Sequence, residues 1–255
     1  MCCFSRPVES VSKTNIFARF IKLDIQAVVY EMSLKAAEDL AMILPLPVAA
    51  EQREQAVRFI NLEGYEGFFT DMNRAFPRPQ SSTLSLSGAT PKNTAKTLEV
   101  EHVGSFEASY VPSVADFGRL DERFRLPAGT WEKLPSYRDF AFAVFKLKSG
   151  NTRPHPMALT FCSVMPGTLF FPTVHFHDGQ VHEYEEFDHM LYAQGWTNAL
   201  IGGREWEESA GNAASVMRKN AAQGLVWPDG HLYRRAITGQ QKNEDILAKA
   251  KRMAW

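Results

Sequence analysis

The sequence predicts an α+β fold, in which mostly antiparallel β-sheets over residues 1–184 are followed by a helical C-terminal part. Up to about residue 184, short segments alternate apolar and polar residues and are rich in β-branched and aromatic side chains, as strands are. From Trp196 onward, Ala, Glu and Arg become frequent and β-branched residues become rare, which favours helices. Strands that precede helices along the chain are typical of α+β proteins.

Local patterns give the individual elements of this prediction. Strands are expected at residues 14–21, 25–34, 40–48, 100–110, 140–148 and 157–164. A short helix or a turn is expected at residues 51–60, and helical segments are expected at residues 67–76, 114–124, 204–222 and 245–253. The continuous apolar run of 40–48 predicts a strand that is buried on both faces. In 67–76, the apolar residues recur at helical spacing and share one face.

Composition and length limit the class of protein. The 255 residues can form one α+β domain, or two β-rich halves joined by the Ser-, Thr- and Pro-rich segment 77–97, which is typical of a linker or loop. A net charge of −1 and a pI of about 6.7 argue against a nucleic-acid partner and against an anionic membrane surface. The sequence has no apolar run of about 18 residues and no secretory signal, so we expect no membrane contact and a cytoplasmic location.

Residues 169–193 carry four of the seven histidines. This stretch reads as a β-hairpin, with strands at about 169–177 and 180–185 around the favoured turn Asp178-Gly179. A two-residue turn there places His175 opposite His182, and residues two apart on a strand point to the same side of the sheet. His175, His177 and His182 are therefore expected to share one face.

Three imidazoles on one face are suited to a transition metal, which would be Cu, Zn or Fe. The alternative is a polar hairpin face that meets water. The pair His175 and His177 resembles the His-x-His pair of the first cupin motif, although His182 stands where that motif has a Glu. His189, in the sequence FDHMLY, is expected on a helical turn as a surface residue or as a fourth ligand.

The chain opens with two adjacent cysteines, Cys2 and Cys3, which are either ligands that complete the histidine site or buried and inert. With Met1 removed, Cys2 would be N-terminal and could act as a nucleophile with its own amine as the base. The opening then resembles that of the N-terminal-nucleophile amidohydrolases, which implies Cys2 and Arg19 as catalytic residues. We also expect the N-terminal segment to lie beside the histidine face.

The first sixty residues resemble a bacterial domain family of unknown function. The residues that carry the likeness are a cysteine near the N-terminus, the strand 27–32, an acidic pair at 38–39 and the strand 41–48. The resemblance implies a β-rich start to the fold and no particular activity.

Three functions are open from the sequence. The first is a metal-dependent enzyme, a hydrolase or oxidoreductase, that acts on a small-molecule substrate at His175, His177 and His182, with Cys2 or Cys3 completing the site. The second is an amidohydrolase that uses Cys2 and Arg19. The third is a non-enzymatic protein that binds a metal or a partner. The sequence does not indicate an oligomeric state.

Overall fold

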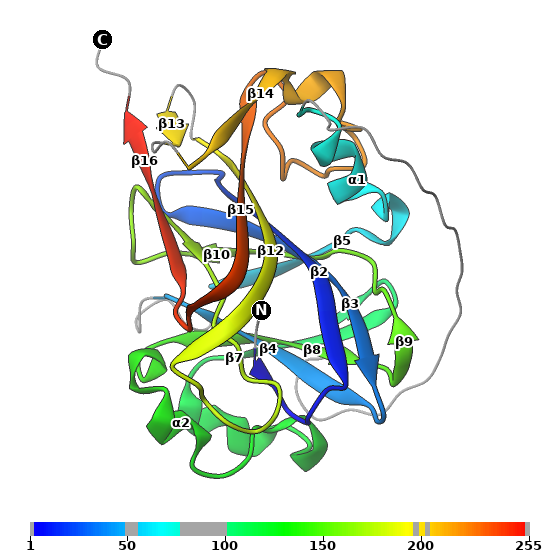
Figure 1. The fold of residues 1–255 in the computed structure, drawn as a ribbon, viewed down its shortest axis with the longest axis vertical. Coiled ribbons are helices and arrows are strands. Elements are labelled where there is room, and N and C mark those ends of the chain that lie inside the picture. Colours follow the sequence, from blue (N-terminus) through cyan, green and yellow to red (C-terminus); the bar gives the residue numbers. More distant parts are fainter. Residues whose placement is uncertain (1–2, 49–55, 77–100, 196–198, 202–204, 253–255) are drawn as a thin grey trace.

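Strands dominate the fold, and those of the described residues form three sheets (Figure 1). The computed structural model describes residues 3–48, 56–76, 101–195, 199–201 and 205–252. The predicted linker at 77–97 lies outside these residues. Within the described part of the chain, no helix is long and apolar enough to cross a membrane.

The largest sheet has eight strands in the order β14-β15-β12-β2-β3-β10-β5, with β9 paired to the end of β3. Its strands are β2 (Ser10–Phe20), β3 (Ile25–Ala36), β5 (Val57–Asn61), β9 (Gly150–Thr152), β10 (Met157–Cys162), β12 (Tyr184–Gln194), β14 (Glu207–Asn212) and β15 (His231–Lys242). Neighbours are antiparallel except for β12 and β2, which run parallel. Strand β12 is therefore interior, between β15 and β2.

Two smaller sheets complete the fold. The five-stranded sheet has the order β1-β4-β8-β7-β6, and the three-stranded sheet has the order β11-β16-β13. Their strands are β1 (Cys3–Phe4), β4 (Leu40–Leu46), β6 (Glu101–Val103), β7 (Phe106–Val111), β8 (Ala141–Leu147), β11 (Thr168–Phe171), β13 (Ala199–Ile201) and β16 (Ile246–Arg252). Each of the two larger sheets contains strands from both sides of the segment 77–97.

Apolar side chains fill the space between the eight-stranded and five-stranded sheets. This central core takes alternate residues from strands of both sheets, such as Tyr30 of β3, Met42 of β4 and Phe145 of β8. The intervening residues of β4, Ala41 and Ile43, point to the other side of their sheet. The prediction that this strand is buried on both faces is therefore confirmed.

Two further clusters cover the outer faces of the sheets. Helix α1 (Phe68–Asn73) and residues 213–226 cover the eight-stranded sheet at Phe17 and Tyr192, in what we call the helix-side core (Figure 1). The five-stranded sheet is covered by a winding segment of short helices. They are η3 (Val114–Arg119), η4 (Glu122–Phe124), α2 (Thr130–Lys133) and η5 (Pro135–Tyr137). Their apolar residues form the loop-side core, which also contains Cys3 and Phe176.

Most of the predicted strands are confirmed. The expected segments correspond to β2, β3, β4, β8 and β10, and the one at 100–110 is the hairpin of β6 and β7. Helix α1 confirms the helical spacing at 67–76. At 114–124 the structure has the 3-10 helices η3 and η4, and the expected short helix at 51–60 is wrong where it is described, since β5 begins at Val57.

The predicted α+β class is wrong, because the fold is mainly β and has no helical C-terminal part. In place of a helix at 204–222 there are β14, the short 3-10 helix η6 (Ala213–Ser215) and turns. In place of a helix at 245–253 there is β16, in which buried Ala248 is followed by exposed Lys249. Alternating Ala and Lys residues favour a helix by propensity, but their period of two matches a strand that is paired on both sides.

Candidate metal centre

The histidine-rich stretch does not form the expected hairpin. Strand β11 ends at Phe171 and pairs with β16, whereas β12 begins at Tyr184 and pairs with β15 and β2. Residues 172–183 between them form a loop, which we call the histidine loop, and Phe176 in it forms an isolated bridge with Cys3. The strands on either side of the loop thus belong to different sheets, β11 to the three-stranded sheet and β12 to the eight-stranded sheet.

The turn that joins β15 to β16 holds the histidine loop in place. The Asn243 side chain accepts a hydrogen bond from the His175 N–H (2.7 Å) and donates to the carbonyls of His175 (3.0 Å) and His182 (2.9 Å). The Asp245 carboxylate accepts from the N–H groups of Thr173 (2.8 Å) and Val174 (3.2 Å). His175 and His182 therefore lie on either side of an amide side chain and not directly opposite each other.

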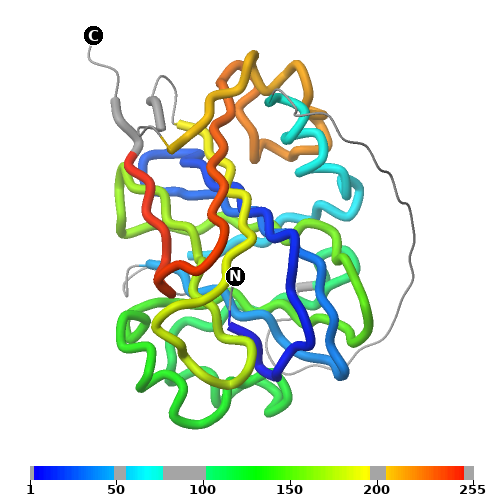
Figure 2. The backbone as a smooth tube through the Cα atoms, viewed as in Figure 1, coloured from blue at the N-terminus to red at the C-terminus, as the bar shows by residue number. Residues whose placement is uncertain are grey.

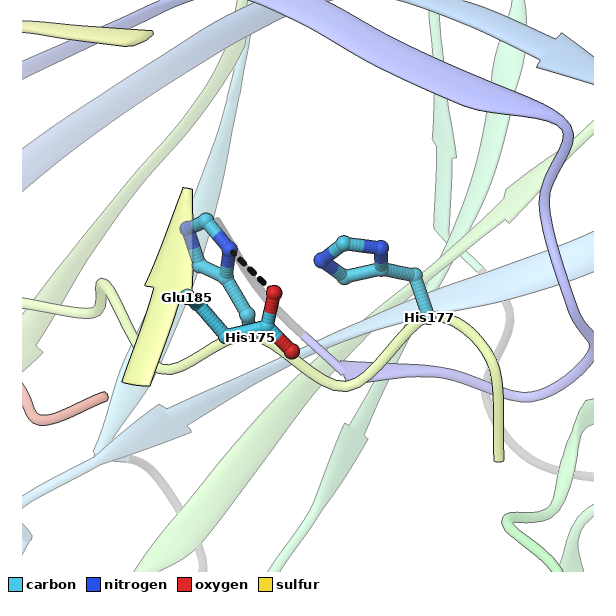
Figure 3. A group of neighbouring side chains, drawn as sticks. All are labelled: His175, His177 and Glu185. Atoms are coloured by element: carbon cyan, nitrogen blue, oxygen red, sulfur yellow. Dashed lines mark ion pairs between the residues drawn. The ribbon is translucent and has the colours of Figure 1, made fainter. Parts of the chain in front are cut away.

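His175, His177 and Glu185 converge at the end of the histidine loop (Figure 3). One ligand atom from each residue lies within 4.8 Å of the others, and His175 Nδ1 is 3.9 Å from Glu185 Oε2. The loop contributes the two histidines, and the start of strand β12 contributes the carboxylate. His175 is 0% exposed, while His177 and Glu185 are half-buried.

Burial determines the protonation of this group. It lowers the pKa of His175 and of His177, so both imidazoles stay neutral near pH 7. Burial also raises the pKa of Glu185. Both ring nitrogens of His175 and the Nε2 atom of His177 are buried without a hydrogen-bond partner. Neutral imidazoles with free nitrogens beside a carboxylate can ligate a transition metal.

His189 lies behind the group, and the expected helical surface position is wrong. It is on strand β12 and is 1% exposed. Its ring stacks on that of His175, with 5.2 Å between the ring centroids, and both rings pack against Phe187. Burial lowers the pKa of His189 well below its ordinary value.

His182 stands apart from the group. Its Nε2 atom is 2.8 Å from Asp178 Oδ2, and its side chain is exposed. The hydrogen bond to Asp178 raises the pKa of His182. The structure thus brings together two of the three predicted histidines, and the third pairs with a carboxylate at the surface.

Cys3 lies close to the histidine loop along the backbone, but it packs on the other side of it. The N–H of Phe4 donates to the Phe176 carbonyl (2.9 Å), and Cys3 is buried in the loop-side core with Val174 and Phe176. Along the loop, these two residues alternate with His175 and His177. The second cysteine, Cys2, lies outside the described residues, so its predicted roles as nucleophile and as ligand stay predictions.

Arg19, the other predicted catalytic residue, lies on β2 at the end of the parallel pairing with β12. Its guanidinium donates to the carbonyls of Gly224 (3.4 Å) and Leu225 (3.3 Å). Burial lowers its pKa to about 10. These contacts tie β2 to the segment that covers the outer face of the eight-stranded sheet, which is a structural use of the side chain.

The sequence prediction missed Glu185 as a ligand, and it placed His189 on a helical turn, as a surface residue or a fourth ligand. A signal was present, because Phe187 and Leu191 occupy alternate positions with Glu185 and His189, as along one face of a strand. Reading FDHMLY as a helical turn broke that alternation. Had the segment been read as a strand, Glu185 and His189 would have been placed on the same face.

Comparison with known proteins gives a likeness of fold alone. No protein-family model matches the sequence, and no curated protein matches it. Among solved structures, a mutated baculovirus P35 after caspase cleavage matches with a TM-score of 0.50 and 10% identity, over 94% of this chain and 100% of that chain. Baculovirus P35 itself matches with a TM-score of 0.49 at 10% identity, over 98% of this chain and 100% of that chain.

A further similar structure is the complex of P35 with caspase-8, with a TM-score of 0.44 and 10% identity, over 94% of this chain and 96% of that chain. The structure that matches with a TM-score of 0.50 is of a P35 that a caspase has cleaved, so the protein that this chain resembles meets a protein, and our expectation of a small-molecule substrate as the partner is wrong. The fold of the chain is similar to that of P35 along almost its whole length.

Proposed function

We propose that this protein acts by binding a protein partner, a protease of the caspase class, and not as a metal-dependent enzyme. The observation that carries the proposal is the likeness to the caspase-cleaved form of P35, which extends over 94% of this chain and all of the other. A fold hosts many functions, so the likeness supplies the partner class by analogy. The partner must then be tested directly.

The position of the histidine group favours a structural use of it over catalysis. A catalytic metal needs a coordination position that is open to substrate. A groove of about 390 Å³ lies nearby, lined by Phe187 and by residues of β15 and β16, but His175, His177 and Glu185 are not among its lining residues. Phe187 separates the groove from the fully buried ring of His175, on which it stacks with 4.2 Å between the ring centroids.

A titration of caspase-8 with the purified protein tests the proposal. A binding partner should reduce protease activity in proportion to the amount added and abolish it near a fixed molar ratio, because each inhibitor molecule occupies one protease site. Size-exclusion chromatography should show a complex, and mass spectrometry should locate any cut in the chain. Composition predicts such a cut in residues 77–97, since Ser, Thr and Pro are typical of exposed linkers.

The control is the same titration against trypsin, a serine protease of a different class, whose activity should be unchanged. If caspase-8 keeps full activity in a molar excess of the protein and no complex elutes, caspase-8 is not the partner and the proposal fails. Equal loss of trypsin activity would also overturn it, because it would indicate simple competition by a cleavable protein.

A further inference from the structure

We propose that His175, His177 and Glu185 form a site for a divalent transition metal, with zinc as its first candidate, that fastens the histidine loop to β12. The site lies in the fold and is independent of the proposed protease partner. Its ligand set differs from the one expected from the sequence, because Glu185 takes the place of His182, and Cys3 packs in the loop-side core. Two histidines and one carboxylate are a set that zinc and non-haem iron both use.

The spacing of the three side chains is close to what a metal needs. Around a tetrahedral metal with bonds of about 2.0–2.2 Å, neighbouring ligand atoms lie about 3.3–3.6 Å apart. The ligand atoms here lie within 4.8 Å of one another, and one pair is at 3.9 Å. A shift of the ligand atoms by about one ångström would bring all three within bonding distance of one metal ion. His177 and Glu185 are half-buried and can rotate toward the fixed ring of His175 (Figure 3).

The unpartnered nitrogens give a second, independent reason for a ligand. Buried polar atoms are almost always hydrogen-bonded, and leaving one unsatisfied costs about 1–3 kcal/mol. His175 has two such atoms and His177 has one. The Glu185 oxygen is too far from His175 Nδ1 for a hydrogen bond, at 3.9 Å. A metal ion between the three side chains would bind one nitrogen of each ring and the carboxylate together.

The backbone of the histidine loop connects the metal site to the N-terminal segment. Phe4 and Val8 donate their N–H groups to the carbonyls of Phe176 (2.9 Å) and His177 (3.0 Å). The segment between them therefore rests on the same residues that carry the ligands, as the path of the chain shows (Figure 2). A metal that fixes the loop would also reduce the opening of this N-terminal segment.

Zinc titration of the metal-stripped protein, with no protease present, tests the site. Calorimetry should show one equivalent of zinc bound, the melting temperature should rise, and hydrogen exchange at residues 4–8 and 175–177 should slow. Glu185→Gln and His177→Gln should each weaken zinc binding by about ten-fold or more, since each removes one of three ligands. Both residues are half-buried, so these variants should still fold.

Two matched controls come from the same stretch. Glu186→Gln removes the exposed carboxylate next to Glu185, and His182→Gln removes the histidine that pairs with Asp178. Both should bind zinc like the unmodified protein. The site is overturned if zinc does not bind to the unmodified protein, or if the control variants lose binding as strongly as the ligand variants. Loss of zinc binding leaves the protease titration untouched, so the two proposals fail separately.

Discussion

Acidification from about pH 7.5 to about pH 5.5 should reduce the free energy of unfolding of the metal-free protein by about 3 kcal/mol. The cause is the burial of His175 and His189, which are 0% and 1% exposed and whose pKa values burial lowers. In the unfolded chain each imidazole takes up a proton below about pH 6.5, while in the folded protein it stays neutral.

The sign follows from proton linkage. Because the unfolded state binds more protons in this range, stability is complete above the unfolded pKa of about 6.5 and is lost as the pH falls below it. Each group contributes about 1.4 kcal/mol per pH unit below that value, so two groups give about 3 kcal/mol near pH 5.5. Many domains have only 5–15 kcal/mol in total, so the loss would be large.

Some groups oppose this trend. Burial raises the pKa of Glu31, Glu185 and Asp245, so the folded state holds their protons more tightly than the unfolded state does. Their contribution is complete below their unfolded pKa of about 4 and is lost as the pH rises through the folded value. These carboxyl groups therefore oppose the effect of the histidines as the pH falls from their folded pKa toward about 4.

Urea denaturation at a series of pH values measures the effect. In His189→Phe, which keeps a ring against Phe187 and His175, the loss between the two pH values should be smaller by about 1.4 kcal/mol, because one buried imidazole no longer takes up a proton on unfolding. His182→Gln is the exposed control and should keep the steep loss. A free energy of unfolding that does not change between pH 7.5 and 5.5, or an unchanged slope in His189→Phe, would show that the buried histidines are protonated in the folded state.

The local sequence pattern predicted most strands of the two large sheets. An alternating segment reflects burial on one face of a strand, and a continuous apolar segment reflects burial on both faces. The pattern failed in the C-terminal part, where Ala, Glu, Lys and Arg have high helix propensity. There β15 and β16 form by pairing with strands far away in the sequence, such as β12 and β11. Tertiary pairing overrode propensity, and a single sequence does not display such pairing.

The candidate site was predicted in part for a related reason. His175 and His177 could be found from their spacing of two, which places both side chains on one side of an extended segment. Their third partner, Glu185, could not be found in this way, because the assumed two-residue turn paired His175 with His182. In the structure, Asn243 and Asp245 lie in a turn about 70 residues away along the chain, and their hydrogen bonds set the loop conformation instead.

Asp245→Ala should reduce the free energy of unfolding by roughly 3 kcal/mol. Among the side chains that hold the histidine loop in place, we expect this substitution to have the largest effect. The Asp245 carboxylate accepts hydrogen bonds from the Thr173 and Val174 N–H groups and from the hydroxyl of Tyr137 (2.7 Å). Thr173 and Tyr137 are buried, so water cannot readily replace the lost acceptor. Each buried donor that loses its acceptor costs about 1–3 kcal/mol. Partial relaxation of the loop should keep the loss of stability below the sum of the costs for the three donors.

Asp245→Asn is the matched rescue, since its carbonyl can still accept from the two N–H groups and its amide can donate to the Tyr137 oxygen. It should lose less than about half as much stability as Asp245→Ala. Glu244→Ala is the neighbouring control, because that side chain pairs with exposed Lys242 (2.7 Å), and exposed ion pairs contribute little to stability. Urea denaturation and hydrogen exchange at residues 173–175 measure all three variants. Equal stability of the Ala and Asn variants would show that the fold does not depend on this carboxylate as an acceptor, and that the histidine loop is held by Asn243 and the loop-side core instead.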